Sequence, residues 1–153
     1  MGSVAATFHL AQFNRAKLLA PLDSPQLAEF VGALARINEI ADESPGFVWR
    51  LQGDGGDATS LRPFGEDVIV NMSLWTSAEA LFDFVYRTAH APVMAKRRQW
   101  FAKPEEAFMV LWWVKAGYIP TIDDARARLD ILKRKGPSPA AFTFKTRFPA
   151  PTV

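Results

Sequence analysis

The fold of this chain is decided by two apolar runs, Val68-Ile69-Val70-Asn71-Met72-Ser73-Leu74-Trp75 and Phe108-Met109-Val110-Leu111-Trp112-Trp113-Val114. Side chains of a β-strand point alternately to its two faces, and an antiparallel sheet with one wet face carries one polar row per strand. Neither run has a clean polar row, because large apolar residues occupy both alternating sets. We therefore expect two strands of a sheet that is covered on both faces.

The segments around these runs predict the order strand, helix, strand, strand, helix, strand. Ser24-Pro25 is typical of a helix start, and Thr76 with Glu79 is typical of a capping box. Glycine and aspartate at 53–57 predict the turn of a long hairpin. The expected strands are 8–14, 47–51, 68–75 and 107–115, and the expected helical segments are 25–41, 77–89 and 91–101. This order is that of a ferredoxin-like βαββαβ unit.

The remainder of the chain predicts an addition to that unit. Thr121 and Asp124 predict the cap of a further helix that ends near Gly136, and residues 142–144 are expected to add a short strand. We therefore expect an α+β fold with an antiparallel sheet and an extra C-terminal helix. It forms a single domain over 1–153, with a core of about 8–115 and an extension of about 116–153.

A ferredoxin-like sheet carries helices on one face, so its other face needs a cover. A second copy of the chain laid across that face would give a homodimer built as a dimeric α/β barrel. Each copy would then hold a pocket between its sheet and its helices or loops, suited to a small hydrophobic or aromatic molecule.

Composition excludes several classes of function. The 153 residues are 49% hydrophobic and contain no cysteine, which excludes disulfides, thiolate nucleophiles and cysteine-ligated metals. Formal charge is only +2, and no basic stripe predicts binding of nucleic acid. The N-terminus lacks the pattern of a signal peptide, and no apolar run approaches the roughly 20 residues needed to span a bilayer. We expect a cytoplasmic protein with no contact to membranes.

Four polar residues interrupt the apolar rows of the predicted sheet. Gln12 and Asn14 share one side of the first strand, and Asn71 and Ser73 break the row that ends in Trp75. Buried amides and hydroxyls must find partners or bind something. Two interpretations stay open at this point, a cavity lined by these groups and a set of hydrogen bonds among themselves and nearby loops.

The titratable candidates are few. His90 is expected to end the second predicted helix, with Tyr86 one turn earlier on the same face. A histidine there suits a general base, a proton shuttle or a haem ligand, but it also suits a simple interaction with a helix C-terminus. Arg50 and Arg87 are candidates for holding an anionic group, or else ordinary surface charges. No motif for a specific reaction is present.

The segments LAQFNRAKLLAPLDSP, INEIADESPGFVWRLQ, NMSLWTSAEALFDFVYRTAH and VLWWVKAGYIPT resemble an uncharacterised domain family. That family is placed in the dimeric α/β-barrel superfamily, beside the antibiotic-biosynthesis monooxygenases. The resemblance implies a homodimer of ferredoxin-like subunits. The better-known branches of the superfamily include cofactor-free oxygenases of polycyclic phenols, haem-degrading monooxygenases, haem-containing dehydratases and polyketide cyclases.

The haem-degrading branch resembles this chain at three positions. An asparagine closes its first strand, a tryptophan closes its third, and a histidine lies on the following helix, as do Asn14, Trp75 and His90 here. The long glycine-rich hairpin and the C-terminal helix depart from that compact pattern.

Three hypotheses follow. The first is a small-molecule enzyme of secondary or aromatic metabolism that uses no cofactor, in which His90 and Tyr86 move a proton while Asn14 and Asn71 stabilise an oxyanion. Its chemistry would be oxygenation, cyclisation or dehydration. The second is a haem-binding protein with His90 as the ligand. The third is a module that binds a ligand without converting it. Candidate contacts to the substrate are Gln12, Arg50, Asn71, Ser73, Trp75 and Arg87.

Overall fold

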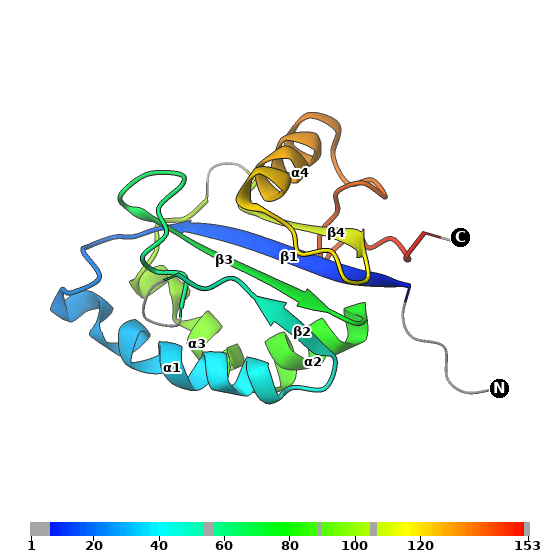
Figure 1. Cartoon of the computed structure of the whole chain (residues 1–153). Helices are drawn as coiled ribbons and strands as arrows, with labels where there is room; N and C mark the ends of the chain where they lie inside the picture. Colours follow the sequence, from blue (N-terminus) through cyan, green and yellow to red (C-terminus); the bar gives the residue numbers. More distant parts are fainter. Residues whose placement is uncertain (1–6, 54–56, 89, 105–106, 152–153) are drawn as a thin grey trace.

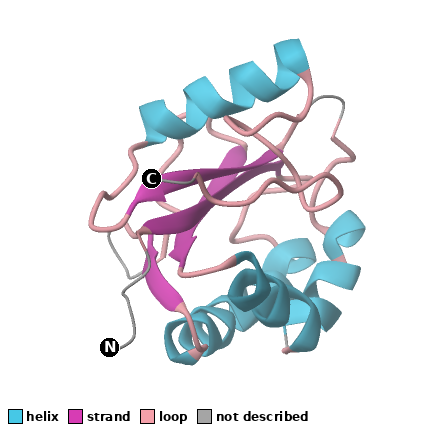
Figure 2. Ribbon diagram, turned by 90° about the vertical axis from the view of Figure 1, so that its right-hand side faces the viewer, coloured by secondary structure: helices cyan, strands magenta, loops and turns pink. Residues whose placement is uncertain are grey.

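The computed structural model describes residues 7–53, 57–88, 90–104 and 107–151, with the backbone only at His90. A four-stranded sheet forms the middle layer, three helices lie on one side of it and one helix lies on the other (Figures 1 and 2). The α+β class, the antiparallel sheet and the ferredoxin-like order of elements are confirmed.

The sheet has the strand order β2-β3-β1-β4, and every neighbouring pair is antiparallel. The first strand is longer than predicted, because it continues past Asn14 and pairs with β3 as far as Lys17. The strands are β1 (Phe8–Lys17), β2 (Phe47–Arg50), β3 (Val68–Trp75) and β4 (Met109–Lys115). Of the predicted hairpin turn at 53–57, residues 54–56 lie outside the described part.

The helices on the first face are α1 (Ala28–Glu43), α2 (Ala78–Arg87) and the short α3 (His90–Ala95). Two predicted caps differ from the structure. Ser24 precedes a 3-10 turn and makes no capping bond with its side chain, and α2 is capped by Ser77 rather than Thr76. Ser77 Oγ accepts a hydrogen bond from Ala80 N at 3.1 Å. The cap therefore lies one residue later than the predicted capping box of Thr76 and Glu79.

The opposite face of the sheet is covered by the chain itself. Helix α4 (Ile122–Lys135) buries Ala125, Leu129 and Leu132 against it, and the connection between β2 and β3 adds Ala58 to the same cluster. The expectation that one face stays uncovered in a single copy is therefore wrong. The physical reason is that the apolar side chains of α4 pack on this face of the sheet and exclude water from it. The homodimer itself stays a prediction.

The start of α4 is fixed as the sequence predicted. Thr121 Oγ1 accepts from Asp124 N at 3.1 Å, and the Asp124 carboxylate accepts from Thr121 N at 2.9 Å, which completes a capping box. Beyond α4, Phe142 pairs with Leu111 at the free edge of β4 through two backbone hydrogen bonds of 2.8 and 2.9 Å. The expected added strand is thus a single bridge. No helix in the described ranges is long and apolar enough to traverse a bilayer.

Shortening one buried side chain of α4 tests whether this helix is packed on the sheet. Leu129 is 5% exposed, so Leu129→Ala removes packed methyl groups and should lower the free energy of unfolding by about 2–5 kcal/mol in urea titrations. Arg134→Ala, which removes an exposed ion pair on the same helix, should change it by about 0.5 kcal/mol or less. Equal small effects of both substitutions would show that α4 is not packed on the sheet in solution.

The capping box also predicts a dependence on pH. Burial would raise the pKa of Asp124, but hydrogen bonds from Tyr118 and Thr121 outweigh it and hold that pKa below its ordinary value of 3.8. The stabilisation is therefore complete above that ordinary value and is lost as the pH falls through the lower folded pKa. The difference in unfolding free energy between wild type and Asp124→Asn should therefore be smaller at about pH 2.5 than at about pH 6, as measured by urea titrations at the two pH values.

Candidate functional site

The four polar residues of the two central strands meet on the face of the sheet that α1, α2 and α3 cover, which we call the helix-covered face. In the register of β1 and β3, Gln12 lies opposite Ser73, and Asn14 lies opposite Asn71. Opposite residues of an antiparallel pair have Cβ atoms roughly 4.5–5.5 Å apart on the same face. The register therefore gathers four side chains that the sequence separates by about sixty residues, and we call Gln12, Asn14, Asn71 and Ser73 the polar patch.

Hydrogen bonds join the whole polar patch. Gln12 Nε2 donates to Asn71 Oδ1 and, at 3.1 Å, to Ser73 Oγ. Asn14 Nδ2 donates to Gln12 Oε1 at 3.0 Å, and Trp75 Nε1 donates to Ser73 Oγ at 2.8 Å. The interpretation in which these groups hydrogen-bond to one another is therefore confirmed. The patch also has an open side, but a cavity lined by these groups stays a prediction.

That open side lies at the two asparagines. Gln12 is 6% exposed and Ser73 is 7% exposed, whereas Asn71 is exposed and Asn14 is half-buried. Val70 and Met72, which flank Asn71 in the strand, point to the other face and are buried. Solvent therefore reaches the polar patch from the helix side, at the end where the two asparagines stand opposite each other.

Apolar clusters border the polar patch on both sides. One contains Leu10, Trp75 and Phe84, and the other contains Ile69 and Trp100. Helix α3 touches both of them, since its Met94 packs against the first cluster and its Val93 against the second. A molecule that meets the asparagines therefore finds neutral amide groups in largely apolar surroundings.

Arg50 lies beside Ser73, at the buried end of the polar patch. It stands opposite Ser73 in the register of β2 and β3, and its guanidinium binds the Asp42 carboxylate of α1 with Nε at 2.8 Å from Oδ1. The Arg50 side chain is only 13% exposed. Its charge is balanced by Asp42, a partner that no sequence pattern indicates, because the contact joins a helix to a neighbouring strand.

Two predicted site residues lie away from the polar patch. Tyr86 is 53% exposed, and its ring stacks on Phe82 and meets Phe144 of the C-terminal segment. Arg87 pairs with Asp83 at 3.5 Å on the outer side of α2 and is 80% exposed. The structure therefore does not bring either residue together with the asparagines.

His90 is the first residue of α3, and its side chain lies outside the described part of the structure. Its predicted roles as proton carrier or haem ligand stay predictions. The described residues contain no group of three or more histidine, aspartate and glutamate side chains suited to a metal ion. Sequence reasoning did not assign Met109 to the site, although it stands opposite Asn14 in the register of β1 and β4.

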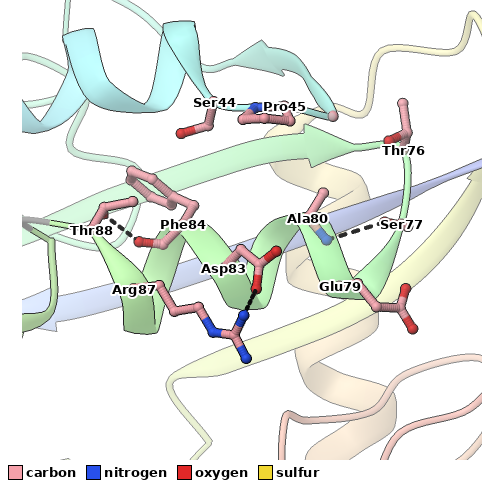
Figure 3. Close-up of a pocket in the computed structure, with 11 residues that line it drawn as sticks. Ser44, Pro45, Thr76, Ser77, Glu79, Ala80, Asp83, Phe84, Arg87 and Thr88 are labelled. Carbon is pink, nitrogen blue, oxygen red and sulfur yellow. Dashed lines mark hydrogen bonds and ion pairs between the residues drawn. The ribbon is translucent and has the colours of Figure 1, made fainter.

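A separate groove of about 550 Å³ runs along α2 (Figure 3). The turn around Gly46 forms one wall, and Ala80, Asp83 and Arg87 of α2 form the other. Several of its polar groups already serve the backbone: Ser44 Oγ donates to Ile40 O at 2.6 Å, and Thr88 Oγ1 donates to Phe84 O at 2.5 Å. The charged side chains of the groove, Glu79, Asp83 and Arg87, are exposed on α2, whereas the polar patch extends to buried residues between two apolar clusters. The polar patch is therefore the better candidate site.

Residues 9–153 match the sequence model of a family described as a domain of unknown function, DUF3291, so this chain belongs to that family. The resemblance drawn from the sequence is thereby confirmed. No curated protein matches the chain.

Solved structures share the fold. A conserved protein from Methanosarcina mazei Go1 aligns with a TM-score of 0.50 and 9% identity over 72% of this chain and 95% of that chain. A protein of unknown function from Nitrosomonas europaea aligns at 0.48 and 17%, over 76% and 98% respectively. SnoaB, a cofactor-independent oxygenase from Streptomyces nogalater, aligns at 0.45 and 18%, over 72% and 95%. At these identities the similarity concerns the fold alone.

The groove wall depends on a glycine, which allows a matched test. Gly46 has φ +84°, and a Cβ there would lie 2.5 Å from Ala80 Cβ and 2.7 Å from Thr76 Oγ1. Gly46→Ala should therefore lower the unfolding free energy by more than about 1 kcal/mol. Gly32→Ala, in the interior of α1 with nothing within 4 Å of the new Cβ, should raise it by roughly 0.5–1 kcal/mol. Similar denaturation midpoints for both variants would contradict the close approach of this turn to α2.

Proposed function

We propose that this chain is an enzyme that binds a small hydrophobic or aromatic molecule at the polar patch and stabilises its enolate or phenolate form without a cofactor. The observation that carries the proposal is the exposed Asn71, paired with Asn14 inside apolar surroundings on the helix-covered face. A fixed amide donor such as Asn71 Nδ2 stabilises a developing negative charge more strongly once a bound molecule displaces the water around it.

Hydrogen bonding within the polar patch suits this role. Gln12 and Ser73 are buried and hold the amides in place, so the groups that meet an oxyanion need not reorganise during the reaction. The amides are neutral and Asp42 balances the charge of Arg50, so the site carries no unbalanced fixed charge, which favours an uncharged aromatic substrate in the ground state. Trp75 is fully buried beyond Ser73, and its indole N–H donates to Ser73 Oγ, which helps to hold the buried end of the polar patch.

His90 is the proposed proton carrier. It begins the helix whose Val93 and Met94 pack beside the polar patch, and no other histidine lies on this side of the molecule in the described part. A histidine changes its charge near neutral pH, so it can take a proton from an activated carbon and return it elsewhere. The enolate or phenolate produced would then react with oxygen in an oxygenase, or undergo ring closure or elimination.

The pocket proposed here is bounded by elements of one chain, because the sheet and its helices supply both walls. The homodimer predicted from the sequence is kept as part of the proposal, but the face covered by α4 is not its contact surface.

The proposal is tested by exchange of carbon-bound hydrogen. In D₂O the protein should accelerate loss of the acidic C1 protons of 2-tetralone, followed by proton NMR, with no added metal, flavin or haem. Asn71→Ala should lower the enzyme-catalysed rate about 100-fold, the size expected for one oxyanion donor. His90→Ala should lower it by roughly 100- to 10,000-fold.

The matched control is Gln52→Ala, which removes an exposed amide outside the polar patch and should leave the rate unchanged. Oxygen uptake recorded in parallel separates an oxygenase from an enzyme that only moves protons. Binding of 2-tetralone with no faster exchange would support the non-catalytic alternative. Full activity of both Asn71→Ala and His90→Ala would overturn the proposed mechanism.

A further inference from the structure

Gln12 occupies a position from which it cannot easily touch a ligand. Its side chain is 6% exposed and makes hydrogen bonds to three neighbours, Asn14, Asn71 and Ser73. Sequence reasoning placed it among the contacts to the substrate. The structure instead places it behind the two asparagines, which are the members of the polar patch that solvent reaches.

A glutamine amide has two chemically different ends. Its NH₂ group only donates hydrogen bonds and its carbonyl oxygen only accepts them. Because Gln12 Nε2 faces Asn71, Asn71 must offer its oxygen to Gln12. Because Gln12 Oε1 faces Asn14, Asn14 must offer its NH₂ group. The other end of each asparagine amide, Nδ2 of Asn71 and Oδ1 of Asn14, is therefore left for the open side.

The two asparagines consequently present unlike groups to the accessible side. Among the hydrogen bonds of the described residues, none uses Asn71 Nδ2 or Asn14 Oδ1. Asn71 thus keeps a donor and Asn14 keeps an acceptor, on residues that stand directly opposite each other. The pair forms one donor and one acceptor a single strand spacing apart.

This pairing does not depend on which way Gln12 is turned. If its amide were rotated by half a turn, Asn71 would donate to it and Asn14 would accept from it, so the two outward groups would exchange places. Ser73 permits both arrangements, because a hydroxyl both donates and accepts while Trp75 Nε1 donates to it. In either state one asparagine offers a donor and the other offers an acceptor.

We propose that Gln12 is a positioning residue that forces Asn14 and Asn71 into opposite hydrogen-bonding polarity, so that the site selects a ligand carrying a hydroxyl group beside a carbonyl group. The carbonyl oxygen accepts from one asparagine and the hydroxyl donates to the other. This inference rests on the proposed function, since it assigns the substrate class at the same site. It makes hydroxyketones and enolised dicarbonyl compounds of aromatic ring systems the preferred substrates.

A matched set of probes tests the selection. The probes are 7-hydroxy-1-tetralone with one donor and one acceptor, 7-methoxy-1-tetralone with acceptors only, and 1,7-naphthalenediol with two hydroxyl groups, the last handled under nitrogen; at these positions the two oxygens cannot hydrogen-bond to each other. Their dissociation constants are measured by calorimetry with the intact wild-type protein. The hydroxyketone should bind roughly tenfold more tightly than the methoxyketone, the factor expected from one additional hydrogen bond.

Gln12→Glu changes the polarity of the pair without changing its shape. A carboxylate accepts on both sides, so both asparagines donate to it and both present an oxygen to the ligand. Above about pH 8, where we expect the carboxyl to be ionised, the preference should shift roughly tenfold from the hydroxyketone toward the diol. Protonation at lower pH restores one donor and one acceptor, so the wild-type order should return. A glutamine with a merely structural role would weaken all probes alike.

Gln12→Met provides a second variant that keeps length and burial but makes no amide hydrogen bonds. It should weaken the hydroxyketone by roughly three- to tenfold and leave the methoxyketone unchanged. In the wild-type protein, the side-chain NH₂ signals of one asparagine should shift on titration with the hydroxyketone while those of Gln12 stay in place. This NMR measurement needs no variant to fold.

The outcomes separate this inference from the proposed function. If wild type binds all the ketones with equal affinity, the selection by polarity is wrong while the enzyme proposal stands. If the Gln12→Glu protein keeps the wild-type order of probes at every pH, Gln12 is not the positioning residue. If no probe binds, both the site and this inference are overturned.

Discussion

The structure depends on the burial of both faces of β1 and β3, the two central strands. On one face Phe13, Met72 and Leu74 are sealed by α4, and on the other Leu10 and Trp75 are sealed by α1 and α2. Each methylene removed from water contributes about 0.8 kcal/mol to the free energy of unfolding. Strands with large side chains on both faces therefore gain the full stabilisation only when helices pack on both faces. A ferredoxin-like unit without α4 would leave one of these faces open.

That requirement also explains where the polar patch lies. The face under α4 is filled by continuous apolar packing in which Phe13, Met72 and Trp112 are at most 1% exposed, and an amide inserted there would lack partners. On the helix face, the two clusters around Trp75 and Trp100 are separate, and the polar patch lies between them. A polar group is tolerated at that boundary because its neighbours satisfy it and solvent reaches one end.

Much of the architecture could be predicted from local patterns. The correct class of fold followed from short-range signals: the large apolar side chains on both faces of 68–75, the capping box of Thr121 and Asp124, and the order of elements. The cover of the second face was missed, since the stripe of Ala125, Leu129 and Leu132 shows that α4 packs on something but does not say on what. The cap of α2 was displaced by one residue because Thr76 and Ser77 are adjacent and equally suitable in composition.

For the site, the sequence identified the right kinds of residue but not their contacts. Strand alternation showed that Gln12 and Asn14 share one side of their strand and that Asn71 and Ser73 share one side of theirs, but not that these two sides coincide. Only the antiparallel register brings those two faces together, because a shift of one residue would turn Asn71 toward α4. Tyr86 failed as a neighbour of the polar patch because helical spacing does not fix the rotation of α2 about its axis, and Phe82 and Phe144 hold the ring elsewhere.

The polar patch is difficult to explain by stability alone. Replacing both partners of a buried hydrogen bond by apolar groups of similar shape is often neutral or even favourable, so apolar residues at Gln12 and Ser73 would serve a purely structural core. The hydrogen bonds among Gln12, Ser73 and Asn71 restrict amides that would otherwise rotate freely, and this order has a free-energy cost in side-chain entropy. Such a restriction is useful when the outward atoms of Asn14 and Asn71 must meet a ligand in one arrangement. The same hydrogen bonds that satisfy the interior therefore determine what the open end of the site can recognise.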